Sequence, residues 1–123
     1  MSPDRSKLEE LVDAYAQAWS DPDPGVRRQR LATSVTDDVT YTDPSAQVTG
    51  RDALAAHLDE FLSRMPGARI ERTTGVDAHG VVARFGWHLV QPDGAAPLVG
   101  LDFVELADDG RIARIVGFFG PLA

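Results

Sequence analysis

Apolar residues in the first half of the chain recur at the three- and four-residue spacing that gathers side chains on one face of a helix. This spacing predicts three helices, at residues 4–19, 24–34 and 51–65. Prolines between Asp21 and Gly25 interrupt the first helix, and Pro66-Gly67 ends the third. Asp23 is expected to cap the short second helix, whose arginines we expect to face solvent.

After Gly67 the apolar period changes to two residues, which is typical of strands. Glycine-containing turns separate four such segments and predict strands at residues 68–78, 81–91, 97–107 and 111–119. The short turns leave no room for crossover helices, so these strands are expected to form one antiparallel meander. An alternating segment at 39–43 predicts one more, short strand. The sequence therefore predicts an α+β fold with three N-terminal helices followed by a sheet.

The strand predicted at 97–107 is apolar on both of its faces. One face carries three large apolar side chains that the helices cannot also cover, namely Val99, Leu101 and Phe103. A large exposed apolar patch is uncommon on a soluble monomer. We therefore expect this outer face of the sheet to form a homodimer interface.

Composition and charge narrow the classes of function. The 123 residues are expected to form one domain, 1–123, and the chain has no Cys for a disulfide or a thiolate metal site. The formal net charge of −7 opposes binding to nucleic acid or to an anionic membrane surface. The chain contains no phosphate- or dinucleotide-binding motif, and its three histidines lack ligand spacing, so neither a cofactor nor a metal is expected. The start of the chain lacks the apolar stretch of a signal peptide, which favours a cytoplasmic protein.

Asp102 breaks the apolar pattern in the middle of its strand, on the face that is expected to be buried. An error of one residue in the register, or an ion pair with Arg84 or Arg114, would explain it without any function. Alternatively, the carboxyl lines an apolar cavity, where desolvation raises its pKa and favours the neutral acid. A neutral acid donates a hydrogen bond to a ligand oxygen and stabilises an oxyanion.

Asp43 and Tyr15 are the other polar candidates for a site. Asp43 ends its strand on the same face as Tyr41, although Asp before Pro is also an ordinary turn signal. Tyr15 lies on the inner face of the first helix together with Trp19, and core packing alone would explain both aromatic residues. A buried Tyr hydroxyl nevertheless needs a partner, and a cavity would provide one.

Three segments in order resemble the nuclear-transport-factor-2-like superfamily, in particular its SnoaL-like polyketide cyclases and ketosteroid isomerases. They are Tyr15-Ala16-Gln17-Ala18-Trp19, then DDVTYTDPSAQVTGRDALAAHL at 37–58, then LDFVELADDGRI at 101–112. The resemblance covers nearly the whole chain. It implies a cone, in which three helices and a curved antiparallel sheet surround a pocket and the outer face of the sheet forms a dimer.

The sequence is similar to the ketosteroid isomerases at three positions, those of Tyr15, Asp43 and Asp102. By this resemblance, Asp43 is the general base that moves a proton next to a carbonyl, while Tyr15 and a neutral Asp102 donate hydrogen bonds to the enolate oxygen. One position departs from the isomerase pattern, since a supporting Tyr of the third helix is replaced by Leu58, with His57 alongside.

A hydrophobic small-molecule substrate, either a steroid or a polyketide-like carbonyl compound, follows from this interpretation. Seven residues are expected to bind it: Trp19, Tyr41, His57, Phe61, Phe85, Trp87 and Phe119, although the pattern alone leaves open whether Phe118 or Phe119 points inward. The alternative to an isomerase or cyclase is a non-catalytic dimeric protein that binds small apolar molecules. Epoxide opening by paired carboxylates ranks last, because it needs an arginine and Arg84 is predicted on the outer face.

Overall fold

Three helices precede most of the sheet in the computed structural model, which describes residues 4–120. They are α1 (Arg5–Ala18), α2 (Pro24–Ser34) and α3 (Arg51–Arg64). Each lies within one residue of its predicted bounds. Asp4 caps α1 by accepting a hydrogen bond from the Lys7 amide at 3.1 Å, and Asp23 caps α2 as predicted, with 2.8 Å to the Gly25 amide. No helix among the described residues is long and apolar enough to cross a membrane.

The sheet has seven strands, and their order confirms the α+β fold. They are β1 (Val35–Asp43), β2 (Ala46–Thr49), β3 (Arg69–Arg72), β4 (Asp77–His79), β5 (Val82–Val90), β6 (Leu98–Leu106) and β7 (Ile112–Phe119). The spatial order is β2-β1-β7-β6-β5-β3, with β4 also paired to β5. The antiparallel pairing of β5 with β6 and of β6 with β7 is the predicted meander.

Four details of the sheet differ from the prediction. The first strand is not short, because β1 covers nine residues, Val35–Asp43, rather than only 39–43. The sheet is mixed rather than wholly antiparallel, because β1 runs parallel to β7, and β1 also pairs with an unpredicted partner, β2. The strand predicted at 68–78 is two short strands, β3 and β4. Between them the hydroxyl of Thr74 accepts the Gly86 amide at 2.8 Å, so that a side chain replaces the regular backbone ladder.

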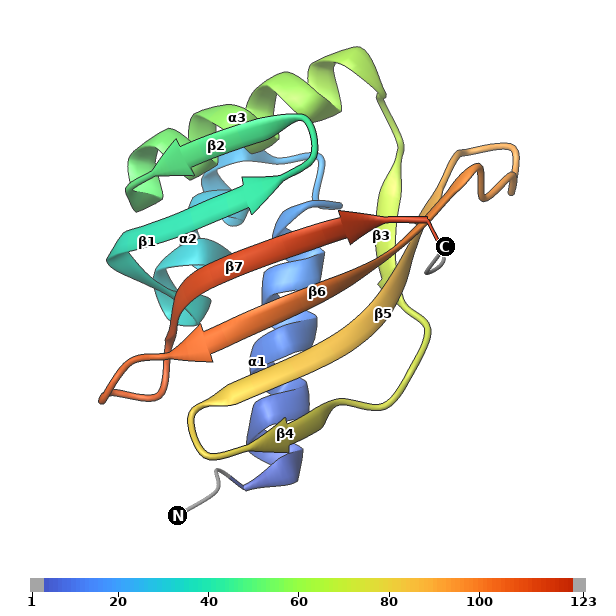
Figure 1. Cartoon of the computed structure of the whole chain (residues 1–123). Coiled ribbons are helices and arrows are strands. Elements are labelled where there is room, and N and C mark those ends of the chain that lie inside the picture. The colour runs from blue at the N-terminus through green and yellow to red at the C-terminus, as the bar shows by residue number, and fades with distance from the viewer. Residues whose placement is uncertain (1–3, 121–123) are drawn as a thin grey trace.

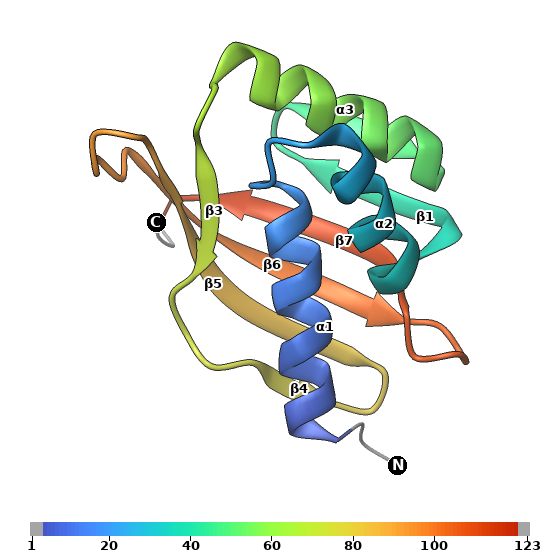
Figure 2. The same ribbon diagram turned by 180° about the vertical axis from the view of Figure 1, so that it is seen from behind.

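All three helices lie on one side of the curved, open sheet, as Figure 1 shows from the uncovered side and Figure 2 from the helical side. The inward residues of β5 and β6 are buried as their alternation predicted, Phe85 and Asp102 among them. The outward residues Val99 and Leu101 are exposed on the side that no helix covers. The register assumed for Asp102 is therefore correct.

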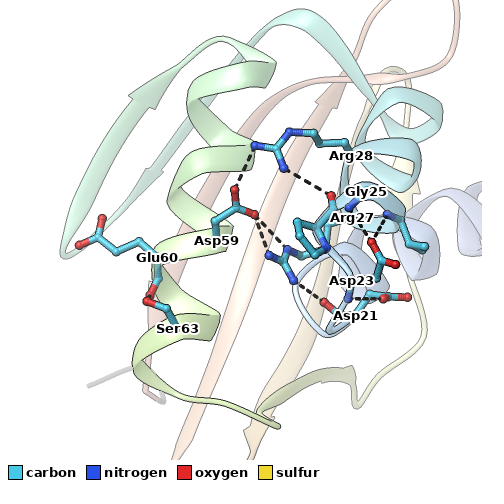
Figure 3. Close-up of polar contacts among 10 residues, drawn as sticks. Asp21, Asp23, Gly25, Arg27, Arg28, Asp59, Glu60 and Ser63 are labelled. Carbon is cyan, nitrogen blue, oxygen red and sulfur yellow. Dashed lines mark hydrogen bonds and ion pairs between the residues drawn. The ribbon is translucent and has the colours of Figure 1, made fainter.

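The expectation that the arginines of α2 all face solvent is wrong for Arg27, which is 6% exposed. Its guanidinium donates to Asp59 Oδ1 of α3 at 2.8 Å and to the Asp21 carbonyl at 2.7 Å (Figure 3). Arg28 donates to the other oxygen of Asp59 at 3.0 Å. The arginine is buried because α2 packs against α3 at this point, and the ion pair ties the two helices together.

Candidate functional site

A cavity of about 530 Å³ lies between the helices and the inner face of the sheet. It is bordered by α1, α3, the β1–β2 hairpin and strands β3, β5, β6 and β7. All ten residues selected from the sequence line it: Tyr15, Trp19, Tyr41, Asp43, His57, Phe61, Phe85, Trp87, Asp102 and Phe119. Phe118 points to the opposite side of the sheet, where it pairs with Leu101, so the ambiguity between Phe118 and Phe119 is resolved.

Asp102 is 7% exposed, and within residues 4–120 the only hydrogen bond to its carboxyl group comes from an indole. Trp87 Nε1 donates to Asp102 Oδ1 at 2.9 Å. Burial raises the pKa of Asp102 to about 7, against the opposing effect of the Trp87 hydrogen bond and with a further contribution from the charge of Asp43. The carboxyl is therefore present as the neutral acid in a large fraction of molecules near neutral pH.

An ion pair does not explain Asp102. Arg84 lies on the outer face and pairs with Asp77 at 2.9 Å, and Arg114 is exposed on β7. Neither arginine bonds Asp102 in the part of the chain that the structure describes. The carboxyl is thus a buried acid without a cationic partner.

Asp43 ends β1 half-buried at the edge of the cavity, with both of its oxygens accepting hydrogen bonds. The Tyr41 hydroxyl donates to Oδ2, while the amide and the hydroxyl of Ser45 donate to Oδ1 at 2.7 and 2.8 Å. The contact to the Ser45 amide is the turn expected of Asp before Pro, so Asp43 both closes the turn and faces the cavity. Three donors fix the orientation of the carboxylate.

Tyr15 is buried on α1, and its hydroxyl has no hydrogen-bond partner within residues 4–120. Burial raises the pKa of this phenol well above its ordinary value, and the negative charge of Asp102 raises it further; the Trp19 side chain, which lowers this pKa, lies near the hydroxyl but makes no hydrogen bond of normal geometry with it. Leu58 is fully buried outside the cavity lining, whereas His57 lines it. Tyr15 thus lines the cavity with a buried hydroxyl that lacks a partner among the described residues, which is uncommon in folded proteins.

Aromatic rings make up much of the remaining wall. The Trp19 indole contacts three of them, with centroid distances of 5.6 Å to Tyr41, 5.7 Å to His57 and 5.3 Å to Phe61. On the strand side, Phe119 meets Trp87 edge-on at 6.1 Å. These flat apolar surfaces suit a hydrophobic ligand.

Two glycines shape the site, and the sequence did not indicate them. A Cβ at Gly100 would lie 2.2 Å from Cζ2 of Trp87, so only glycine lets the indole lie on β6. A Cβ at Gly117 would lie 3.0 Å from Asp102 Oδ1. Both roles depend on cross-strand register, which residue spacing does not reveal. Ser45 was also missed, although the Asp-Pro-Ser turn motif is a signal that could have found it.

The arrangement does not provide the arginine that epoxide opening by paired carboxylates would need. Within residues 4–120 the arginine of the cavity lining is Arg64, an exposed residue at the end of α3 that pairs with Glu60. No guanidinium lies between Asp43 and Asp102 in the described chain. The described residues also contain no cluster of three or more side chains able to hold a metal ion.

The sequence model of the SnoaL-like domain matches residues 12–115. A solved structure from Agrobacterium tumefaciens is 31% identical to this chain with a TM-score of 0.88, and the match covers 94% of this chain and 99% of that one. That protein is described as a proposed isomerase of the SnoaL-like family. A proposed polyketide cyclase from Sinorhizobium meliloti is 18% identical with a TM-score of 0.71, covering 94% and 99%. A de novo designed protein with a curved β-sheet is 17% identical with a TM-score of 0.73, covering 97% and 89%. At these low identities, the last two structures show similarity of fold alone. No curated protein matches the chain.

Proposed function

This chain belongs to the SnoaL-like family, and we propose that its cavity catalyses proton transfer next to the carbonyl of a neutral, hydrophobic substrate. The substrate is a steroid or polyketide-like compound, and the reaction is double-bond isomerisation or an aldol-type cyclisation, which share an enolate. One observation carries the proposal: Tyr15 and Asp102, two buried residues with acidic protons, line the same cavity as the carboxylate of Asp43.

Each residue has a distinct part in the proposed isomerisation. Asp43 removes a proton from the carbon next to the carbonyl, and the electrons of that C–H bond pass to the carbonyl oxygen as an enolate. Tyr15 and the neutral Asp102 donate hydrogen bonds to this oxygen. Asp43 then returns the proton to the γ-carbon, which moves the double bond into conjugation. A carboxylate is a weak base for carbon acids, so the reaction depends on the two donors.

The charges of the lining favour a neutral substrate. Asp43 and Glu60 are acidic, and the exposed Arg64 at the rim is already paired with Glu60. A carboxylate or phosphate on the substrate would meet these acids, and no Lys or Arg of the lining within residues 4–120 is free of an acidic partner to offset them. The cavity volume falls within the range of about 300–1,000 Å³ that is usual for small-molecule sites.

The test is conjugation of an unconjugated steroid enone, followed by ultraviolet absorbance, with wild type and Asp43→Asn in parallel. We expect turnover by the wild type and a loss of about 10²- to 10⁴-fold in the variant. Ligand binding, measured by quenching of tryptophan fluorescence, serves as the control because Asn fills the same space. If the wild type binds the ligand tightly without turnover, and Asp43→Asn binds it equally well, the protein is instead a non-catalytic binder of small apolar molecules.

We also propose that the protein is a homodimer through the outer face of β6 and β7. Its exposed apolar residues support this: Val99 is 48%, Leu101 37% and Phe118 54% accessible in the single chain. They lie on neighbouring strands, since Leu101 pairs with Phe118, on the side that no helix covers (Figure 1). Apolar side chains on adjacent strands form one patch that a second copy of the chain could bury.

A further inference from the structure

Asp102 has two carboxyl oxygens, and only one of them carries the proton when the acid is neutral. A proton on the oxygen that faces protein would leave the acid unable to donate to a ligand. The value of Asp102 as a donor therefore depends on which oxygen is protonated, and the contacts of the two oxygens differ.

An indole N–H donates hydrogen bonds and cannot accept them. Trp87 Nε1 lies 2.9 Å from Asp102 Oδ1, in a buried contact between β5 and β6. Oδ1 accepts this bond, and because a carbonyl oxygen is a better acceptor than a hydroxyl oxygen, the bond favours the neutral acid that has its proton on Oδ2. No side-chain hydrogen bond within residues 4–120 involves Oδ2, so Oδ2 is the oxygen of this cavity residue that is free to bond a ligand.

The indole is held where this contact requires it. Trp87 pairs with Gly100 across β5 and β6, and any side chain at Gly100 would overlap the indole ring. The edge of the Phe119 ring meets the indole from β7. The indole of Trp87 is therefore packed closely between Gly100 and Phe119 while it also lines the cavity.

We propose that Trp87 is a positioning residue for Asp102, whose indole N–H keeps Oδ1 as the acceptor so that Oδ2 carries the proton and presents it to the substrate oxygen. This inference rests on the proposed function only for its effect on catalysis. The hydrogen bond does not depend on turnover, so its response to the ionisation of Asp102 can be measured even in a protein without catalytic activity, and the two proposals can fail separately.

The first experiment follows the indole N–H resonances of the intact protein by ¹H–¹⁵N NMR between pH 5 and 9. The chain has two tryptophans, and Trp19→Phe assigns the remaining signal to Trp87. We expect the Trp87 signal to shift with a midpoint near pH 7, because ionisation of Asp102 strengthens the bond. The shift should disappear in Asp102→Asn. A Trp87 signal that does not move while Asp102 titrates would overturn the proposal.

Other titratable groups around Asp102 require a control. Tyr15 approaches from α1, Asp43 and Tyr41 from β1, and His57 of α3 lines the same cavity. An imidazole titrates in the same pH range, and His57 contacts Trp19 rather than Trp87. His57→Gln should therefore keep the Trp87 titration. Its loss in that variant would assign the shift to His57 and also overturn the proposal.

The second experiment compares Trp87→Phe with Trp19→Phe in the enone assay. Both variants remove an indole from the cavity wall, but only Trp87→Phe removes the hydrogen bond that lowers the pKa of Asp102. We expect the alkaline limb of kcat to move up by about one pH unit in Trp87→Phe. At pH 5.5, where Asp102 is neutral, kcat of Trp87→Phe should fall about three- to tenfold, because the Asp102 proton is no longer held on the oxygen that bonds the substrate. If Trp87→Phe instead lowers kcat by the same factor at every pH and leaves the alkaline limb of the kcat profile in place, Trp87 has a merely structural role.

Discussion

Asp102 lies directly opposite Gly117 in the pairing of β6 with β7. A Cβ at Gly117 would stand 3.0 Å from Asp102 Oδ1 and 3.4 Å from the Cβ of Asp43. Because Thr42 pairs with Val116 in the parallel ladder, Asp43 comes next to Gly117 on the other side. The two carboxyl groups therefore flank a glycine in one row across three strands, and the absence of a side chain there leaves both of them room.

Gly117→Ala should disturb the site more than the fold. The new methyl group would push Asp102 Oδ1 by a few tenths of an ångström, while the backbone conformation is open to alanine. We expect activity to fall about tenfold, since displacements well below 1 Å already weaken catalytic alignment. The free energy of unfolding should change by no more than about 1 kcal/mol. Gly75→Ala is the matched control, because a Cβ there contacts nothing.

Tyr15→Phe should separate stability from activity. The variant removes a buried hydroxyl that has no partner in the described chain, so the free energy of unfolding should stay the same or rise by up to about 1 kcal/mol. Turnover should fall about 10²- to 10³-fold, because an oxyanion donor is lost. Urea denaturation and the enone assay measure the two effects. A clear loss of stability would mean that the hydroxyl has a structural partner.

Local signals were sufficient for the helices and for singling out Asp102. The helices follow from apolar spacing together with Pro and Asp at their ends, which act within a few residues. Asp102 was found because an acid interrupts an apolar strand face, and the tertiary structure preserves that conflict as a buried acid with a raised pKa. Conflicts between local preference and burial are expected at functional sites.

Features that depend on distant segments were not predictable in the same way. The parallel pairing of β1 with β7 joins segments more than 70 residues apart, and no periodicity records it. Arg27 was expected on the surface because a helical arginine usually is, and only the packing of α3 against α2 buries it. Gly100 matters through the ring of Trp87 opposite, which requires the register of β5 with β6.

The stability of the wild type should fall as pH rises from about 4 to about 7. The pKa of Asp102 is about 7 in the folded chain and 3.8 as a reference for the unfolded one, so the folded state holds an extra proton in this window. The loss reaches up to about 4 kcal/mol. Asp102→Asn, which stays neutral, should lack this slope in urea denaturation at pH 4.5, 5.5, 6.5 and 7.5. Parallel slopes in the two proteins would contradict a raised pKa.

Asp59→Asn should destabilise the protein by about 2 kcal/mol at pH 7. The change leaves the buried Arg27 without its anion, although the partial exposure of Asp59 limits the cost. Glu60→Gln on the same helix is the control, because its exposed pair with Arg64 contributes about 0.5 kcal/mol or less. Hydrogen bonds from Arg27 and Arg28 lower the pKa of Asp59 against the effect of desolvation. The contribution of Asp59 is therefore present above about pH 4 and is lost as pH falls below it. Equal effects of the two substitutions would show that the ion pair does not hold α2 to α3.

Leu101→Glu should convert the proposed dimer into a monomer. Leu101 lies in the exposed apolar patch of β6 and β7, and burying a carboxylate there against a second copy would cost several kcal/mol. Light scattering after size-exclusion chromatography, at micromolar protein, gives the mass of each species. Val81→Glu is the matched control, because Val81 is 56% exposed but lies in the turn before β5. We expect a dimer for the wild type and the control. A monomeric wild type, or a dimer that persists in Leu101→Glu, would place the interface elsewhere or remove it.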